Sequence, residues 1–326
     1  MYKVFFITFG CKVNQYETDS MRSEFVSQGF VETDSADDAD IIIINSCTVT
    51  GSGDSKSLYS VRKMRKIAPN AIIALTGCLP QAAPEIAAKI PEADIVAGTK
   101  DRRKLPELVR SVIAERRHIV AIDQYGAHDE FELTRFEGAQ DKTRAFVKIQ
   151  DGCNQFCSYC IIPYARGRLR SKPIDALKDE ISRLAQSGRR EIVLVGINLA
   201  FYGVEFGLRL ADAVEVCCKT EGIERVRLGS LEPEILSDED LRRLAALPEL
   251  CPQFHLSLQS GSENTLKAMN RKYTAADYFT LTQKIRAAFP NASFTTDIMV
   301  GFPTETEEDF AESMRFAEKI GFAKIH

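Results

Sequence analysis

Long apolar runs and an excess of positive charge are both missing from this sequence of 326 residues. No apolar stretch approaches the roughly 20 residues that cross a bilayer, and residues 4–9 are too short for the core of a signal peptide. The formal net charge is −4, so the chain lacks the basic overall field that is the simplest sign of nucleic-acid binding. These absences predict a cytoplasmic protein without a membrane anchor, in which any RNA contact comes from local basic patches.

Signs of secretion are also absent, and this affects how the nine cysteines are interpreted. Disulfides are disfavoured in the cytosol, where clustered cysteines more often bind metal or take part in catalysis. The chain is 44% hydrophobic and 27% charged, as is typical of globular proteins, and its length suits about two domains.

The first part of the chain, residues 1–124, alternates between short apolar runs rich in β-branched residues and helical patterns. Residues 101–117, for example, carry apolar side chains at helical spacing along one face. Alternation of this kind predicts an α/β domain with a doubly wound parallel sheet. Its strands are expected at residues 4–9, 41–45, 71–76, 95–97 and 119–122.

Residues 125–142 are polar and contain Gly126 and Gly138, so we expect a linker or an exposed crossing segment. Residues 143–326 resume the alternation, with six strands and five helices, and predict a partial (β/α)6 barrel whose active site lies at the C-terminal ends of the strands. The last residues resemble the middle of a strand, so we expect a chain truncated at its C-terminal end. The strands are expected at 145–150, 192–195, 226–229, 254–258, 294–300 and 322–325, and the helices at 174–187, 208–219, 237–246, 275–289 and 305–320.

Three cysteines follow the first strand of the second domain with the spacing C-x3-C-x2-C: Cys153, Cys157 and Cys160. Three thiolates on one loop can hold three irons of a [4Fe–4S] cluster and leave the fourth iron open for chemistry. Zinc is the main alternative, but it prefers four ligands, and no fourth Cys or His follows at finger spacing. Buried, inert cysteines are the other alternative.

A second set consists of Cys11, Cys47 and Cys78, each of which follows a predicted strand. All strand C-termini of a parallel sheet lie at one edge, so these three thiols can converge on one object. Gly10 and Gly77 would let the backbone turn sharply just before the cysteine. Any one of the three alone is more often a small buried side chain, but three at equivalent places favour a second cluster. The remaining cysteines, at 217, 218 and 251, are interpreted as structural.

The segment Cys153-x3-Cys157-x-Tyr159-Cys160 resembles the signature of radical S-adenosylmethionine (SAM) enzymes. The resemblance implies that SAM binds the open iron and is cleaved by one electron to a radical that abstracts hydrogen from a C–H bond. It also implies that Tyr159 lies beside the adenine. The protein would then supply positioning and exclusion of water.

Further stretches over essentially the whole chain resemble the methylthiotransferases of this superfamily. The resemblance implies two [4Fe–4S] clusters, the auxiliary one held by Cys11, Cys47 and Cys78, and two SAM molecules per turnover. The resemblance also implies a small C-terminal barrel that binds RNA in family members, and we expect this barrel to be missing here. The similar stretches are residues 9–19, 45–50, 76–78, 160–171, 255–262, 269–274 and 297–306.

A SAM pocket needs polar groups at strand ends and an apolar wall for adenine. Each of these polar residues can equally make an ordinary loop-end hydrogen bond. Val300 and Gly301 are expected to form the floor under the adenine. The polar candidates are Gly196, Asn198, Glu232, Ser257 and Gln259.

Arg166, Arg168 and Arg170 form a basic stretch directly after the cluster loop, and we expect them to contact the RNA backbone. Residues 10–16 and 166–168 are most similar to the branch that modifies N6-threonylcarbamoyladenosine at position 37 of tRNA. The alternatives are isopentenyladenosine in tRNA, an aspartate of a ribosomal protein, another radical SAM methylase, and a non-enzymatic iron–sulfur redox or sensor protein. The family also implies an electron donor such as flavodoxin or ferredoxin, and we expect a monomer.

Overall fold

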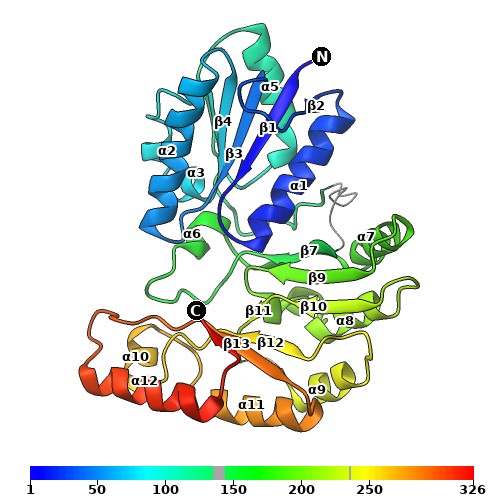
Figure 1. Cartoon of the computed structure of the whole chain (residues 1–326), viewed down its shortest axis with the longest axis vertical. Helices are drawn as coiled ribbons and strands as arrows, with labels where there is room; N and C mark the ends of the chain where they lie inside the picture. Colours follow the sequence, from blue (N-terminus) through cyan, green and yellow to red (C-terminus); the bar gives the residue numbers. More distant parts are fainter. Residues whose placement is uncertain (135–143, 235) are drawn as a thin grey trace. The chain divides into compact units, whose positions relative to one another are not determined.

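A computed structural model describes residues 1–134, 144–234 and 236–326 (Figure 1). The described residues form two units, one of residues 1–134 with Ile161–Arg168 and the other of residues 144–160 with Leu169–His326. The short segment Ile161–Arg168, which directly follows the C-x3-C-x2-C loop, therefore packs with the N-terminal unit, which the sequence did not predict. Across the described residues, no helix combines the length and apolar character needed to cross a membrane.

The first unit contains a parallel sheet with the strand order β2-β1-β3-β4-β5-β6. Its order is that of a doubly wound fold with a switch point between β1 and β3, which confirms the predicted fold class. The strands are β1 (Lys3–Thr8), β2 (Val31–Glu32), β3 (Ile41–Ser46), β4 (Ile72–Gly77), β5 (Ile95–Ala97) and β6 (Ile119–Ala121). The helices are α1 (Lys12–Ser27), α2 (Gly51–Ile67), α3 (Cys78–Ala82), α4 (Pro84–Ala87), η1 (Arg102–Lys104), α5 (Leu105–Ala114) and α6 (Ile162–Arg166).

Strand β3 shows how the sequence builds this sheet. Ile41 and Ile43 pack with apolar side chains of α1 and α5 on one face, such as Phe25. Ile42 and Ile44 pack on the other face with side chains of α2. Because successive side chains of a strand point to opposite faces, a run of isoleucines fills both core layers of a sheet covered on both sides.

The second unit is a partial barrel of parallel strands. Two four-stranded sheets, β10-β9-β7-β8 and β11-β12-β13-β14, follow one another in chain order, and among the strands of the described residues β8 alone is antiparallel to its neighbour. The predicted (β/α)6 arrangement is therefore confirmed, with a break in strand pairing between β10 and β11. The strands are β7 (Arg144–Asp151), β8 (Arg170–Ser171), β9 (Glu191–Gly196), β10 (Arg225–Leu228), β11 (Ser230–Leu231), β12 (Gln253–Leu256), β13 (Ser293–Thr296) and β14 (Lys324–Ile325). The helices are α7 (Ile174–Gln186), η2 (Leu199–Phe201), η3 (Val204–Phe206), α8 (Leu210–Cys218), α9 (Asp238–Ala245), α10 (Glu263–Ala268), α11 (Ala275–Ala288) and α12 (Glu307–Ile320).

The predicted linker, residues 125–142, lies partly outside the described residues, which omit 135–142. Its first part, residues 125–134, makes several contacts within the N-terminal unit. Phe131 is buried, the Tyr125 hydroxyl lies 2.9 Å from Thr99 Oγ1, and Thr134 Oγ1 donates to Ser20 Oγ at 3.0 Å. Apart from Phe131, residues 125–134 are exposed or half-buried, and composition alone does not show which of them make these contacts.

Candidate iron–sulfur and SAM sites

Cys11, Cys47 and Cys78 lie at the carboxyl edge of the N-terminal sheet. Ser46 at the end of β3 pairs with Gly77 at the end of β4, so Cys47 and Cys78 follow paired residues. Cys11 follows β1, the other neighbour of β3. In doubly wound folds, ligands bind at this edge near the switch point, which here lies at the ends of the paired strands β1 and β3.

Two glycines make the close approach of these loops possible. Gly10 has a φ of 101°, and a Cβ placed there would lie 2.9 Å from Cys47 Sγ. Gly77 also has a φ of 101°, and a Cβ there would lie 2.5 Å from Asn45 Oδ1. The sharp turns predicted at both glycines are therefore present, and a side chain at either would clash.

Burial shapes the chemistry of these thiols. It raises the pKa of the Cys47 thiol and also that of Cys78, since a thiolate is poorly solvated there. Arg166, which donates from Nη2 to Cys78 Sγ at 3.4 Å, acts in the opposite direction on Cys78. Cys11 is exposed, and its charge raises the pKa of both other thiols. The structure therefore places the three predicted cysteines near one another.

The loop with Cys153, Cys157 and Cys160 follows β7 after a turn at Gly152, whose φ is 69°. Cys153 Sγ accepts hydrogen bonds from the backbone N–H of Gln155 at 3.5 Å and from Asn198 Nδ2 at 3.6 Å. Burial raises the pKa of the Cys153 thiol. Hydrogen bonds of this kind stabilise the thiolate form, which is the form that binds metal.

Residues 268–271 anchor this loop, a role that sequence reasoning missed. Ser158 donates from its backbone N–H to Met269 O at 3.0 Å, and Asn270 Nδ2 donates to Phe156 O at 2.9 Å. Arg271 Nη1 donates to Cys157 Sγ at 3.2 Å. The stretch 269–274 was noted only for its similarity to the family, and no local pattern shows that it meets a loop about a hundred residues earlier.

Arg271 also contacts several of the predicted SAM-binding residues. It is ion-paired with Glu232, and it donates from Nη1 to the Tyr159 hydroxyl at 3.5 Å and from Nη2 to Ser257 O at 3.3 Å. Burial raises the pKa of Glu232 although Arg271 lowers it, and burial likewise raises the pKa of Tyr159. Tyr159, Glu232 and Ser257 are thus brought to one place.

Asn198 and Gly196 lie together at the end of β9. Gln150 Oε1 accepts from the Asn198 backbone N–H at 2.6 Å. A Cβ at Gly196 would lie 3.0 Å from the Cβ of the same Gln150, so the glycine makes room for this side chain. Asn198 is buried, and its Oδ1 atom has no hydrogen-bond partner within the described residues. A buried acceptor without a partner beside a cysteine loop suits a polar ligand.

Gln259, Val300 and Gly301 are less closely tied to this group. Gln259 has a φ of 66°, and its backbone bonds to Asp297 and Met299. Val300 is 63% exposed, and a Cβ at Gly301 would meet open space. Their part in the SAM pocket stays a prediction.

Two of the three predicted RNA-contact arginines are buried instead. Arg166 is 0% exposed and pairs with Glu17, and Arg170 is buried 3.4 Å from the carboxylate of Asp151. The prediction that Arg166 and Arg170 contact RNA is therefore wrong, because neither guanidinium reaches the surface. Arg168 is exposed and remains a candidate.

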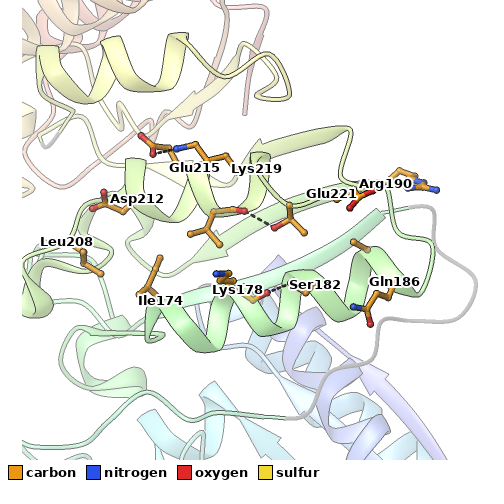
Figure 2. Close-up of a pocket in the computed structure, with 14 residues that line it drawn as sticks. Ile174, Lys178, Ser182, Gln186, Arg190, Leu208, Asp212, Glu215, Lys219 and Glu221 are labelled. Carbon is orange, nitrogen blue, oxygen red and sulfur yellow. Dashed lines mark hydrogen bonds and ion pairs between the residues drawn. The ribbon is translucent and has the colours of Figure 1, made fainter.

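A surface groove of about 910 Å³ lies between α7 and α8 (Figure 2). Its charged side chains come from both helices and from the segments that follow them, and Lys219 pairs with Glu215 at 2.7 Å. It contains none of the cysteines. This groove is therefore separate from both cysteine sets.

The donor sets fit iron–sulfur clusters. None of the nine cysteines, all of which are described, forms a disulfide. In the described ranges, no three His, Cys, Asp or Glu side chains gather closely enough to hold a single metal ion. A [4Fe–4S] cluster binds each cysteine to a different iron, so its ligands need not converge on one point. The space kept by Gly10 and the N–H groups directed at Cys153 and Cys157 suit such a cluster.

Comparison with known proteins agrees with this geometry. The model of the radical SAM superfamily matches residues 147–317, and that of uncharacterized protein family UPF0004 matches residues 3–98. A radical SAM methyltransferase of Kitasatospora setae, TsrM, has the same fold, with a TM-score of 0.71 at 13% identity over 100% of this chain and 72% of that one.

Curated relatives define the family more narrowly. The threonylcarbamoyladenosine tRNA methylthiotransferase MtaB of Chlamydia pneumoniae is 39% identical over 98% of this chain and 72% of its own length. MtaB of Bacillus subtilis is 37% identical over 100% of this chain and 73% of its own. A tRNA-2-methylthio-N(6)-dimethylallyladenosine synthase of Clostridium novyi is 38% identical over 98% and 72%. The chain belongs to the radical SAM methylthiotransferase family, whose members use SAM and carry two [4Fe–4S] clusters.

Proposed function

We propose that this enzyme adds a methylthio group to C2 of N6-threonylcarbamoyladenosine at position 37 of tRNA. The observation that carries the proposal is the 39% identity to the Chlamydia pneumoniae enzyme over 98% of the chain. Relatives from Aquifex aeolicus and Thermotoga maritima with the same name are 37% and 38% identical. Methylthiolation of dimethylallyladenosine is the second candidate, because the Clostridium novyi relative is 38% identical.

The two cysteine sets divide the work in this proposal. Cys11, Cys47 and Cys78 would hold the auxiliary cluster, and Cys153, Cys157 and Cys160 would hold the cluster that binds SAM. When bound, the clusters and SAM supply the radical that takes hydrogen from the target C–H bond and the methylthio group that replaces it.

The surrounding side chains orient these groups. Asn198 and Arg271 donate to the sulfurs of Cys153 and Cys157, which fixes the loop for electron transfer. Tyr159 supplies an aromatic face for the adenine. The Arg271–Glu232 ion pair, whose side chains are 4% and 19% exposed, orders this part of the strand ends and helps to shield a reactive radical from solvent.

The partners follow from the reaction. Arg168 is the exposed member of the basic stretch after the cluster loop and would contact the tRNA backbone. A one-electron donor such as flavodoxin or ferredoxin would reduce the cluster. A tRNA substrate places the enzyme in the cytoplasm, and we propose that it acts as a monomer.

The test is a transfer assay with the anaerobically reconstituted chain, SAM and a reductant. Three substrates are compared: tRNA with threonylcarbamoyladenosine, tRNA with isopentenyladenosine, and the ribosomal protein. Mass spectrometry of the digested products should show methylthiolation of the first substrate alone. Product from the second alone would assign the chain to the other tRNA branch, and product from the protein alone would overturn a tRNA function.

A further inference from the structure

Arg166 is completely buried beside the auxiliary cysteines. Its guanidinium donates from Nη1 to Glu17 Oε1 at 2.5 Å and from Nη2 to Glu17 Oε2 at 3.0 Å. The same Nη2 lies 2.6 Å from Asn14 Oδ1 and 3.4 Å from Cys78 Sγ. A buried guanidinium needs a paired carboxylate, and Glu17 meets this need without the two further contacts.

Asn14 connects this guanidinium to all three cysteine loops. Its Nδ2 donates to Phe9 O at 2.8 Å, just before Cys11, and to Ser46 O at 2.9 Å, just before Cys47. Its Oδ1 accepts from Arg166, which also reaches Cys78. The Asn14 amide and the Arg166 guanidinium therefore hold the three loops in fixed positions relative to one another.

Glu17 also binds a second buried arginine, which does not share these contacts. Arg102 Nη2 lies 3.1 Å from Glu17 Oε2, and its Nη1 lies 3.3 Å from Glu132 Oε2. The two positive charges of Arg102 and Arg166 are balanced by the two negative charges of Glu17 and Glu132. Within this balanced group, Arg166 is the arginine that donates to a cysteine sulfur.

We infer that Arg166 is a positioning residue for the auxiliary cluster: it donates a hydrogen bond to the Cys78 sulfur and keeps a positive charge beside it. This inference rests on the proposed function, which assigns Cys11, Cys47 and Cys78 to that cluster. Hydrogen bonds to cluster sulfurs and nearby positive charge stabilise the reduced cluster and so raise its reduction potential. Residues outside the ligand shell also slow metal loss, and their mutation typically costs about 10- to 100-fold in metal affinity.

The arginine comes from an unexpected part of the chain. Arg166 lies in α6, within the segment Ile161–Arg168 that directly follows Cys160 in the sequence. The polypeptide that forms the radical SAM loop thus goes on to support the other cysteine set. This arrangement makes Arg166 part of the N-terminal site although most family signals around it belong to the radical SAM motif.

The test uses the full chain in which Cys153, Cys157 and Cys160 are alanine, so that only the auxiliary cluster contributes. This parent is compared with Arg166→Lys, with Arg166→Gln/Glu17→Gln, and with Arg102→Gln as the control. Arg166→Lys keeps the charge but loses the planar fork, and the double variant leaves no buried charge of the pair unmatched. Arg102→Gln removes another buried guanidinium, 6% exposed, that does not donate to a cysteine.

The midpoint potential, followed by electron paramagnetic resonance, should shift to more negative values in both Arg166 variants and shift less in Arg102→Gln, whose guanidinium does not donate to a cysteine sulfur. Iron release to a chelator should be about 10- to 100-fold faster in the Arg166 variants alone. Complete iron loss in the Arg166 variants alone supports the same role. Equal potentials and release rates in all four proteins, or equal iron loss in the control, would overturn the inference and leave the two-cluster function intact. A parent without iron would overturn both.

Discussion

The two cysteine sets are built in different ways but share one device. Cys11, Cys47 and Cys78 come from three separate strand ends, whereas the other three come from a single loop after β7. In each set an arginine held by a glutamate donates to one sulfur: Arg166 with Glu17 at Cys78, and Arg271 with Glu232 at Cys157.

The comparison also extends to the backbone. A glycine with positive φ precedes the cysteine at three of these loops, with values of 101° at Gly10, 101° at Gly77 and 69° at Gly152. Such a turn directs the next side chain out of the strand end without a Cβ in the way. A cluster site on a parallel sheet therefore needs both an opened turn and a fixed donor, whether its ligands are adjacent in sequence or far apart.

The largest expected effect is that of Gly10→Ala. The new Cβ would lie 2.9 Å from Cys47 Sγ, so the auxiliary site should lose its irons, about four of the eight that two cubanes hold. The matched control is Gly29→Ala, at a φ of 88° with no atom within 4 Å. It carries similar backbone strain and should keep all eight. Iron analysis after reconstitution decides, and equal iron contents would show that the clash at Cys47 is harmless.

A smaller effect is expected from breaking the arginine pairs. Arg271→Gln leaves the Glu232 carboxylate, whose side chain is 19% exposed, without its partner, and should destabilise the apoprotein by about 3–5 kcal/mol. Arg166→Gln should cost less, because Glu17, although only 3% exposed, keeps Arg102 as an ion-pair partner. Urea unfolding at pH 7 measures both.

The control for this pair of variants is Arg242→Gln. Arg242 and its partner Glu239 are 72% and 55% exposed, and solvent screens such a pair. Its unfolding midpoint should match that of the parent. A midpoint for Arg271→Gln equal to that of this control would show that the shared arginine–glutamate device does not stabilise the fold.

The smallest effect is expected at the cysteines outside both sets. Cys217→Ala/Cys218→Ala should keep about eight irons, as two cubanes require, because both thiols are buried in α8. Burial raises the pKa of Cys218 to about 12. The stability that this protonated thiol contributes is complete below about pH 8.5, the pKa of an unfolded thiol, and is lost as the pH rises toward about 12.

The parent should therefore lose stability above about pH 8.5 more steeply than the double variant. Unfolding midpoints across this alkaline range measure the difference. Loss of about four irons in the variant would instead add these cysteines to the metal ligands.

Much of this organisation could be predicted from the sequence because its signals are local. Alternating apolar runs gave the parallel sheet and the barrel strands, and cysteines after strands gave both sets. Short elements such as α10 and β2 were missed because a few residues carry too little periodicity. The order of the strands within each sheet was not predicted, because it depends on pairing between segments that are far apart in the sequence.

The arginines show a feature that neighbouring residues in the sequence cannot predict, namely which charged side chains are buried. A basic stretch such as Arg166, Arg168 and Arg170 is typical of an exposed surface. Arg166 is nevertheless buried, and its partner Glu17 lies 149 residues earlier in the chain. Arg271 reaches Cys157 across 114 residues. A buried charge depends on its partner, and a partner so distant leaves no trace in the spacing of neighbouring residues.

The measurement that tests the two-cluster account most directly is iron and sulfide content after anaerobic reconstitution. It compares the unmodified chain with two triple variants, in which alanine replaces either Cys11, Cys47 and Cys78 or Cys153, Cys157 and Cys160. The account predicts about eight irons for the unmodified chain and about four for each variant. About four irons in the unmodified chain and none after loss of Cys153, Cys157 and Cys160 would contradict it and leave a single cluster.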